Sequence, residues 1–398
     1  MPMRDAAQAA CVSRSFLHSW RSHPNLDFSI TTLGLNKKAY KNDEIARYFS
    51  NKVDHILGKH SGIGIEEFTL ALPKKAKYNF PYSLLSNGSG DSIRYLHLDC
   101  CSFHPTSELG WLRTLTRLHL CDVCISRGEL GSLLSSSLTL EQLEIMYCDG
   151  IVCLKVPCIL QRLSYLKVLG CSRLRVIDSA APNIYSFYFA GDCRIKLSLG
   201  AALQMKDLHM SFSGAVHCTR VELPSSMPNL ETATIHSGNE IANTPMLHSK
   251  YVHLKNLSIA LTAATFSPTY DYFSLASFFD ACPSLEIFLL NVSSDYVDPS
   301  DMRHMPEQQH HNIKSVKILG FTSSKSLVEL TCHVVENITS LEHNCSRCST
   351  LPIDVLMEAQ RALFAVRAYI EPKVPSTVKL DIVEPCRRCH AAELTVSG

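Results

Sequence analysis

The stretch Leu115-Thr-Arg-Leu-His-Leu120 decides the fold, because its pattern recurs along most of the chain. The pattern is an apolar residue, two residues of any type, an apolar residue, one of any type and a third apolar residue. Its apolar triplets are Ile93/Leu96/Leu98, Leu115/Leu118/Leu120, Leu140/Leu143/Ile145, Leu163/Leu166/Val168, Ile184/Phe187/Phe189, Met205/Leu208/Met210, Leu230/Ala233/Ile235, Leu254/Leu257/Ile259, Leu285/Phe288/Leu290 and Ile313/Val316/Ile318. Successive triplets start 22, 25, 23, 21, 21, 25, 24, 31 and 28 residues apart, so the chain is predicted to be a repeat protein.

Each pattern predicts one short strand of a parallel stack. Side chains alternate between the two faces of a strand, so the last two apolar residues of each pattern point to the same side. One strand cannot bury that side alone, whereas stacked repeats form a continuous core. The period is that of leucine-rich repeats. We therefore predict an α/β fold, a right-handed leucine-rich-repeat solenoid with a parallel inner sheet; the alternative, Leu-rich strands in an ordinary α/β fold, poorly explains ten successive patterns.

The segments between the patterns predict the outer side of the solenoid. Residues 129–134 and 273–279 carry apolar side chains at helical spacing, and Pro283 would stop the second helix. Other connections are short and contain proline, which predicts irregular turns. These prolines are Pro157, Pro182, Pro224 and Pro228.

The two ends of the chain differ from the middle. Residues 5–21 predict one amphipathic helix with Asp5 as its N-cap, and residues 43–57 predict a second helix. Ile65/Phe68/Leu70 is an early, imperfect pattern. Near the other end, residues 353–370 predict a helix capped by Asp354, and residues 378–383 alternate as a strand. We expect residues 31–62 to form a helical N-terminal cap or linker, residues 63–319 the repeats and residues 320–398 a C-terminal cap.

Charge and composition narrow the classes of partner. Lys and Arg number 38 against 37 for Asp and Glu, a formal net charge of +1, so we expect neither nucleic acid nor membrane as a partner. Residues 1–16 contain no apolar run of signal-peptide length, which favours a cytoplasmic or nuclear location. The 17 cysteines are then expected to be reduced. Cys100, Cys148 and Cys171 follow their patterns closely, where leucine-rich repeats use Asn or Cys to hold the turn.

Two Cys-x-x-Cys pairs, Cys345/Cys348 and Cys386/Cys389, are the candidate metal ligands. Four thiolates suit tetrahedral zinc, and a zinc-dependent module is one interpretation. However, 37 residues separate the pairs, against about 15 to 20 in a sequential zinc ribbon. We therefore favour plain cysteines and expect no cofactor. The sequence also lacks the Gly-x-x-x-x-Gly-Lys-Ser/Thr, His-Glu-x-x-His and Gly-x-Ser-x-Gly motifs, so we expect no enzyme.

The stretch Arg4-Asp-Ala-Ala-Gln-Ala-Ala-Cys-Val-Ser-Arg-Ser-Phe-Leu-His-Ser-Trp20 resembles the second half of an F-box, with Val12-Ser13-Arg14 and Phe16 matching its core. The tail segments Glu358-Ala-Gln-Arg-Ala-Leu-Phe-Ala-Val-Arg-Ala-Tyr-Ile370 and Glu384-Pro-Cys-Arg-Arg-Cys-His390 resemble those of a plant subfamily. Together with the repeats, these motifs are similar to the plant F-box/leucine-rich-repeat (FBD-like, RNI-like) family. Residues 1–30 would then be a partial F-box.

The resemblance implies a role in ubiquitin transfer. In that family the F-box binds the adaptor of an SCF-type cullin-RING ubiquitin ligase, and the repeats capture the protein substrate. The expected partners are therefore adaptor, cullin and an unknown protein substrate, with adaptor contacts from Val12, Phe16 and Trp20. The family's opening Leu-Pro segment is not found, because the sequence begins Met1-Pro2-Met3. We expect either an upstream start or a reduced adaptor surface; in the second case the chain would be a scaffold that recruits no ligase.

Strand geometry names the residues on the predicted concave face. They flank the inward apolar pairs and include many Tyr, His and charged side chains, which suit protein recognition, although any strand array exposes some solvated surface. The predicted concave residues are Tyr95, His97, Asp99, Arg117, His119, Gln142, Glu144, Tyr165, Lys167, Tyr188, Asp207, His209, Thr234 and His236. The candidate substrate contacts are Tyr95, His97, Arg117, His119, Glu144, Tyr165, Lys167, Tyr188, His209 and His236.

Overall fold

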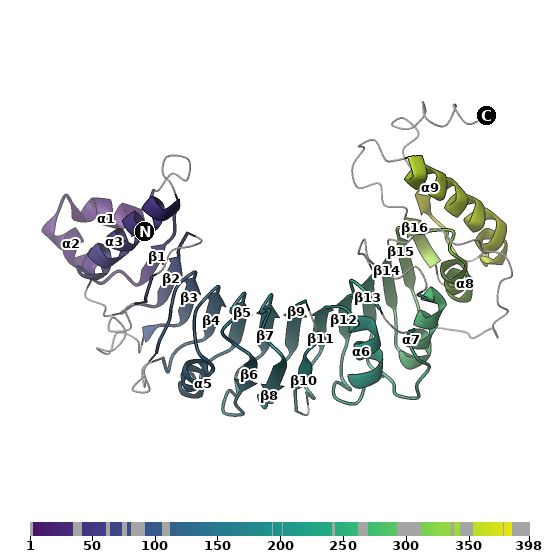
Figure 1. Ribbon diagram of the computed structural model, residues 1–398, viewed down its shortest axis with the longest axis horizontal. Coiled ribbons are helices and arrows are strands. Elements are labelled where there is room, and N and C mark those ends of the chain that lie inside the picture. The colour runs from purple at the N-terminus through teal and green to yellow at the C-terminus, as the bar shows by residue number, and fades with distance from the viewer. Residues whose placement is uncertain are drawn as a thin grey trace. The chain divides into compact units, whose positions relative to one another are not determined.

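A computed structural model describes the chain in two compact units, Met1–Gln204 and Met205–Gly398 (Figure 1). The described residues are 3–34, 42–60, 64–73, 78–80, 92–105, 112–192, 194–200, 202–240, 243–261, 270–292, 312–335, 338–342, 353–376 and 378–383. Each unit is built on a parallel sheet of short strands, one from each repeat. The predicted α/β leucine-rich-repeat fold is confirmed.

The sheet of the first unit runs in chain order. Its strands are β1 (Asn25–Phe28), β2 (Glu67–Ala71), β3 (Tyr95–Asp99), β4 (Arg117–Cys121), β5 (Gln142–Met146), β7 (Tyr165–Leu169) and β9 (Ser186–Ala190). Neighbours pair in parallel without a slip, for example Leu118 with Leu143 and Leu120 with Ile145. Those four side chains are at most 1% exposed. The second and third apolar positions of each pattern therefore form the core.

Strand β1 was not predicted from the sequence. Its Leu26 and Phe28 are buried, and Phe28 begins a line of aromatic rings inside the first repeats. The Phe28 and Phe68 ring centroids are 5.7 Å apart, and Phe68 to Phe80 is 5.3 Å. Phe80 then meets the Phe103 ring at 5.4 Å. These edge and tilted ring contacts give β1 a core of its own.

Helices stand at the β1 end of the first unit. Met3–Ala10 forms α1 and Arg14–Arg21 forms α2, so the single helix predicted over residues 5–21 is wrong. The break falls at Ser13, which is extended (φ −147°, ψ 141°) and occupies the N-cap position of α2, where serine is favoured. The second predicted helix is confirmed as α3 (Asn42–Leu57).

The outer side of the first unit combines a helix with short strands. The predicted helix is confirmed as α5 (Arg127–Ser136), held by a capping box between Ser126 and Glu129. A second parallel sheet of β6 (Cys153–Val156), β8 (Val176–Ser179) and β10 (Lys196–Ser198) follows, below β5 to β9 in Figure 1. Periodicity missed these strands because three or four residues carry too little alternation to register. Pro157 and Pro182 lie in the turns between the inner and outer strands, as predicted.

One residue after each of four inner strands has a left-handed backbone. These residues are Cys100 (φ 56°), Asp122 (φ 50°), Tyr147 (φ 53°) and Gly170 (φ 62°). The side chain of the next residue turns inward, and in two repeats that residue is a buried cysteine, Cys148 or Cys171. Cys148 Sγ donates to the Met146 carbonyl at 3.3 Å, and Cys171 Sγ donates to the Leu169 carbonyl at 3.6 Å. Cys101 occupies the equivalent place. It, rather than the predicted Cys100, therefore fills the inward turn position in its repeat.

The second unit repeats the plan with helices on its outer side. Its strands are β11 (Asp207–Ser211), β12 (Thr232–His236), β13 (Asn256–Leu261), β14 (Ile287–Val292), β15 (Ser315–Leu319), β16 (Ile338–Glu342) and β17 (Ile382–Val383). Its helical elements are α6 (Ala215–Glu222), η2 (Tyr272–Leu275), α7 (Ala276–Ala281), α8 (Lys325–Val334), α9 (Ile353–Ala365), η4 (Val366–Ile370) and η5 (Glu371–Lys373). The predicted helix before Pro283 corresponds to η2 and α7, whereas α6 was not predicted.

The region after residue 319 still adds to the sheet, because β16 pairs with β15 and β17 pairs with β16. The predicted strand over 378–383 shortens to Ile382–Val383. Helix α9 begins one residue before the expected cap Asp354, and its last turn widens into the π-helical η4. Ala359, Ala362, Val366 and Ile370 form its buried face.

Two buried charged side chains secure the outer side of the second unit. The Arg220 guanidinium on α6 donates to the carbonyls of Leu247 (2.6 Å) and Ser249 (3.1 Å) and to the Ser249 hydroxyl (3.2 Å). Glu240 accepts from the backbone N–H groups of Val216 (2.8 Å) and His217 (3.3 Å) in the first turn of α6. Both residues are at most 2% exposed. Each therefore ties α6 to a loop of the next repeat.

Candidate protein-binding surface

The parallel register lines up the outward side chains of the first unit in rows. The first row is Asn25, Glu67, Tyr95, Arg117, Gln142, Tyr165 and Ser186. The second row is Asp27, Thr69, His97, His119, Glu144, Lys167 and Tyr188. Eight of the ten predicted substrate contacts fall in these rows, so the structure brings them onto one face.

Contacts run along the second row from strand to strand. The His97 and His119 rings stack with centroids 4.2 Å apart and planes 15° from parallel. His119 Nδ1 lies 4.0 Å from Glu144 Oε2, and Lys167 Nζ donates to the same oxygen at 3.2 Å. Lys167 Nζ also lies 5.8 Å from the Tyr188 ring centroid. Five adjacent strands thus hold one another's side chains in place.

The first row contains a second cation on an aromatic ring. The Arg117 guanidinium lies 4.7 Å from the Tyr95 ring centroid, and Arg117 Nη2 lies 3.6 Å from Glu67 Oε1. Tyr95 and Arg117 are direct neighbours on β3 and β4. Such cation–π contacts stabilise exposed pairs by about 0.5–1 kcal/mol, so they fix the two side chains more than they stabilise the fold.

Burial and neighbouring charges set the protonation of these groups. Burial lowers the pKa of His97, and the nearby His119 lowers it further. Burial also lowers the pKa of His119, although Glu144 partly offsets that shift. Burial lowers the pKa of Lys167, but the hydrogen bond and the charge of Glu144, with smaller contributions from Tyr165 and Tyr188, together outweigh burial, so the pKa is raised. Near neutral pH the second row therefore carries two neutral imidazoles beside one ion pair.

The other two predicted contacts, His209 and His236, lie on β11 and β12 of the second unit. Their ring centroids are 5.3 Å apart with planes tilted by 32°. Burial, followed by the charge of His236, lowers the pKa of His209 to about 4. Their neighbours on the next strands are uncharged, since Thr234 pairs with Ser258 and Ser258 with Leu289. This part of the sheet offers fewer charges than the rows of the first unit.

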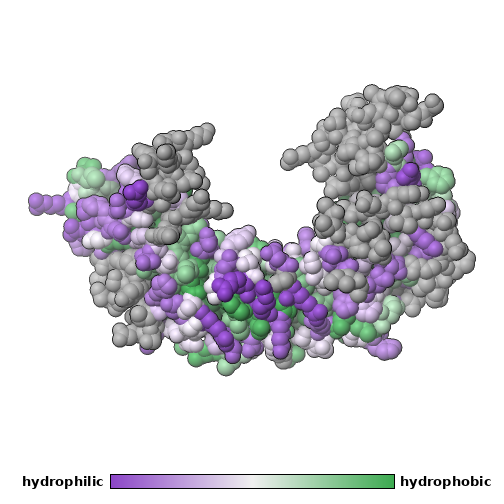
Figure 2. Space-filling view, in the orientation of Figure 1, coloured by the Kyte–Doolittle hydropathy of each residue, from purple (hydrophilic) through white to green (hydrophobic). Residues whose placement is uncertain are grey.

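The three predicted adaptor residues divide into two exposed and one buried. Val12 is 86% exposed and Phe16 is 51% exposed, whereas Trp20 is only 8% exposed. Figure 2 shows apolar surface among the hydrophilic side chains of the α1–α2 region. Trp20 therefore has little surface to offer a partner and instead packs α2 onto the unit. Val12 and Phe16 supply the exposed apolar surface.

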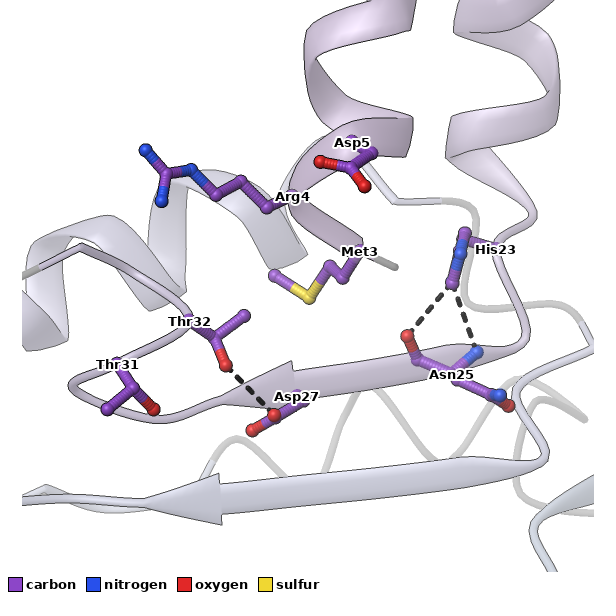
Figure 3. Close-up of a pocket in the computed structure, with 8 residues that line it drawn as sticks. All are labelled: Met3, Arg4, Asp5, His23, Asn25, Asp27, Thr31 and Thr32. Atoms are coloured by element: carbon purple, nitrogen blue, oxygen red, sulfur yellow. Dashed lines mark hydrogen bonds between the residues drawn. The ribbon is translucent and has the colours of Figure 1, made fainter. Parts of the chain in front are cut away.

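A pocket of about 520 Å³ lies between α1 and β1 (Figure 3). It is lined by Met3, Arg4, Asp5, His23, Asn25, Asp27, Thr31 and Thr32. Thr32 Oγ1 donates to Asp27 Oδ2 at 2.9 Å, and His23 Nδ1 lies 2.9 Å from the Asn25 carbonyl oxygen. Because Asn25 and Asp27 are also the first members of the two rows, the pocket adjoins the rows at β1.

Sequence reasoning missed Asp27, Glu67 and Thr69 as members of the rows. It treated β2 as an imperfect repeat and did not recognise β1. The available signal was the alternation of Leu26 and Phe28 after Pro24, but the first apolar position of the pattern is absent there. The pocket residues contributed by α1 and by the turn 29–34 could not be inferred, because they meet only in three dimensions.

The candidate zinc ligands Cys345, Cys348, Cys386 and Cys389 lie outside the described residues. Within the described ranges, no group of three or more His, Cys, Asp or Glu side chains is arranged to hold a metal. No helix in that same part of the chain is both long and apolar enough to cross a membrane.

A parallel sheet assembled from short repeats, with ordered rows of polar and aromatic side chains, defines the chain as a leucine-rich-repeat protein. The family described as At1g61320/AtMIF1, LRR domain, matches residues 22–387, and the chain belongs to this family. A relative from Arabidopsis thaliana, whose name describes an FBD-associated F-box protein, At1g61330, is 22% identical over 86% of each chain. These similarities place the chain among plant F-box/leucine-rich-repeat-type proteins.

Proposed function

We propose that the chain is the substrate-recognition subunit of an SCF-type cullin-RING ubiquitin ligase. In this proposal α1 and α2 contact the adaptor, and the two rows of the first unit contact a protein substrate. The observation that carries it is the F-box-like stretch Arg4–Trp20, which forms two helices with exposed apolar side chains beside a leucine-rich-repeat sheet. The name of the Arabidopsis relative supports the same role.

The adaptor contact would rest on apolar burial. Val12 at the turn after α1 and Phe16 on α2 are open to solvent, and burying such side chains yields about 25 cal/mol per Å² of apolar area. Burial of Trp20 fixes the position of α2, so the two exposed side chains are presented by an ordered element. Two side chains bury only a modest apolar area, so we expect a single charged residue at this surface to weaken adaptor binding strongly.

The substrate contact would use the ordered side chains of the rows. Tyr95, Tyr188 and the stacked histidines are held by neighbours on adjacent strands, so little side-chain entropy is lost when a partner binds. A receptor of this kind holds its substrate close to the transfer machinery of its partners and needs no catalytic group of its own. We place its action in the cytoplasm or nucleus.

The alternative is a scaffold that binds a protein through the rows but recruits no ligase. It predicts that partner binding survives while the adaptor is absent from the complex. The two functions therefore make different predictions for adaptor binding by α1 and α2, and the same prediction for partner binding by the sheet.

Co-purification of the full chain with the cullin-RING adaptor tests the proposal. Phe16→Asp places a charge on the apolar surface of α2 and should abolish the complex. Leu203→Asp is the matched control, because Leu203 is exposed to a similar extent (54%). It lies in a turn before β11, far from α2 in the sequence. Absence of the adaptor from the parent chain would contradict the ligase role and favour the scaffold. Retention of the adaptor by the Phe16 variant would contradict adaptor binding through α2.

A further inference from the structure

Charge is unevenly distributed along the inner face of the first unit. On β1, β2 and β3 the outward positions carry three carboxylates, Asp27, Glu67 and Asp99, and no Lys or Arg. From β4 onward the cations Arg117 and Lys167 appear, each beside a carboxylate, Glu67 and Glu144 respectively. Across the described strands four carboxylates thus face two cations, and the excess negative charge belongs to Asp27 and Asp99.

The histidines do not offset this charge. His97 and His119 lie between the carboxylates of β3 and β5, and both would need to be protonated to neutralise them. Burial lowers the pKa of each imidazole, and the Lys167 charge lowers that of His119 further. Asp27, Asp99 and Glu144 act in the opposite direction but do not reverse the shift. The face therefore stays acidic at neutral pH.

The aromatic side chains already accommodate cations. Arg117 lies over Tyr95 at 4.7 Å, and Lys167 lies over Tyr188 at 5.8 Å. These internal pairs show that the tyrosine rings are oriented with faces available to positively charged groups. A cationic side chain from a partner would meet the same kind of surface on neighbouring strands.

The pocket at β1 extends the acidic region. Asp5 from α1 and Asp27 from β1 line it, and its volume of about 520 Å³ is ample for a single long side chain. Arg4 also lines the pocket, but its cationic side chain extends away from Asp27 (Figure 3). The apolar part of an entering side chain would lie along Met3, whose side chain occupies the space between α1 and Thr32 (Figure 3).

We propose that the rows of the first unit, together with Asp99 beside them on β3, bind an extended, basic segment of the protein partner, with Lys or Arg side chains over Asp27 and Asp99 and one of them in the pocket between α1 and β1. The proposal rests on the substrate-binding role given above and names the chemistry of the segment. An acidic segment would instead face the excess carboxylates and be repelled.

The test is a selection of displayed random peptides on the intact chain, followed by affinity measurements of the chosen peptides. The key variant combines Asp27→Asn and Asp99→Asn, which keeps the side-chain shape; Glu67 is left unchanged because its loss would free Arg117. The matched control combines Asp178→Asn, on the outer strand β8, and Asp192→Asn, in the connection between β9 and β10, two exposed carboxylates of the same unit. Thermal unfolding of all three proteins verifies that each is folded.

We expect the selected peptides to be rich in Lys or Arg, and to bind the key variant about fivefold more weakly than the parent or the control. Their affinity for the parent should also fall with added salt. Peptides that lose binding with Tyr188→Ala but carry no excess of Lys or Arg would overturn the inference and leave recognition by the rows intact. Peptides indifferent to both changes, or no selected peptide at all, would overturn the inference and count against substrate binding on this face.

Discussion

Each unit has its own inner sheet of parallel strands, but the charged side chains with the most partners lie on the inner face in the first unit and on the outer side in the second. In the first unit His119, Glu144 and Lys167 point outward from the inner sheet; the corresponding middle positions of β12, β13 and β14 are Thr234, Ser258 and Leu289. In the second unit the charges of Arg220 and Glu240 are buried among the outer helices instead. The same strand arrangement therefore carries exposed polar rows in one unit and buried charge contacts in the other.

The largest expected effect is on Arg220. Arg220→Met removes three hydrogen bonds to the loop at Leu247 and Ser249 and leaves their carbonyls unpaired, which should lower the free energy of unfolding by about 3 kcal/mol. Denaturant unfolding of the parent and variant measures this difference. Arg162→Met, on an exposed turn residue of the first unit, is the control. Equal stabilities of the two variants would contradict the conclusion that buried charges stabilise the second unit.

Glu240 should have the next largest effect. Glu240→Ala frees the backbone N–H groups of Val216 and His217 at the start of α6 and should lower the free energy of unfolding by about 2 kcal/mol. Burial raises the pKa of the Glu240 carboxyl above its usual 4.5. The folded protein therefore binds this proton more tightly than the unfolded chain, and the contribution of Glu240 to stability falls as pH rises above 4.5.

Glu240→Gln tests that pH dependence directly. Its stability relative to the parent should improve as pH rises from 4.5 towards 7, since glutamine resembles the protonated acid and does not ionise. Denaturant unfolding at several pH values gives the difference. A constant difference across this range would show that Glu240 titrates as it does in the unfolded chain.

On the inner face the expected effect on stability is small. Lys167→Ala removes an ion pair with Glu144 in which both side chains are 25% exposed, and it should change the free energy of unfolding by less than about 1 kcal/mol. Binding of a basic partner segment to the second row should nevertheless strengthen, because the loss of Lys167 leaves the Glu144 carboxylate without its neutralising cation and uncovers the Tyr188 ring. Unfolding and peptide-binding measurements on one protein separate the two effects. A loss of stability as large as that of Arg220→Met would show that the rows hold the fold together.

The smallest effect concerns the two imidazole pairs. Proton NMR titration should give a pKa of about 4 for His209 and values below 6.5 for His97 and His119. His236→Asn removes a nearby imidazole and should raise the pKa of His209 slightly, because burial is the larger cause of its shift. An ordinary pKa for His209 would show that its ring is open to water.

The repeat pattern predicted the parts of the fold that depend on periodicity. Leu118 and Leu120 could be placed in the core and Arg117 and His119 outside it, because alternation along a strand assigns each residue to a face. Strand β1 was missed, because its repeat lacks the first apolar residue. Arg220 and Glu240 were missed for a different reason, since their partners lie 20 to 30 residues away and no local spacing marks them. The break between α1 and α2 falls at Ser13, whose backbone is extended, and the continuous apolar spacing on either side of it gave no sign of the break.

The in-register pairing of β1 to β9 also sets a length scale. Neighbouring strands lie about 4.8 Å apart, so the second row from Asp27 to Tyr188 spans roughly 29 Å, the length of about nine extended residues. Side chains on one face of an extended segment repeat every 6.6 Å or so, and three such steps equal about four strand spacings. In a segment lying straight across the row, one side chain would therefore lie opposite Asp27 and another opposite Glu144, both carboxylates. The side chains between them would not line up with residues of the row.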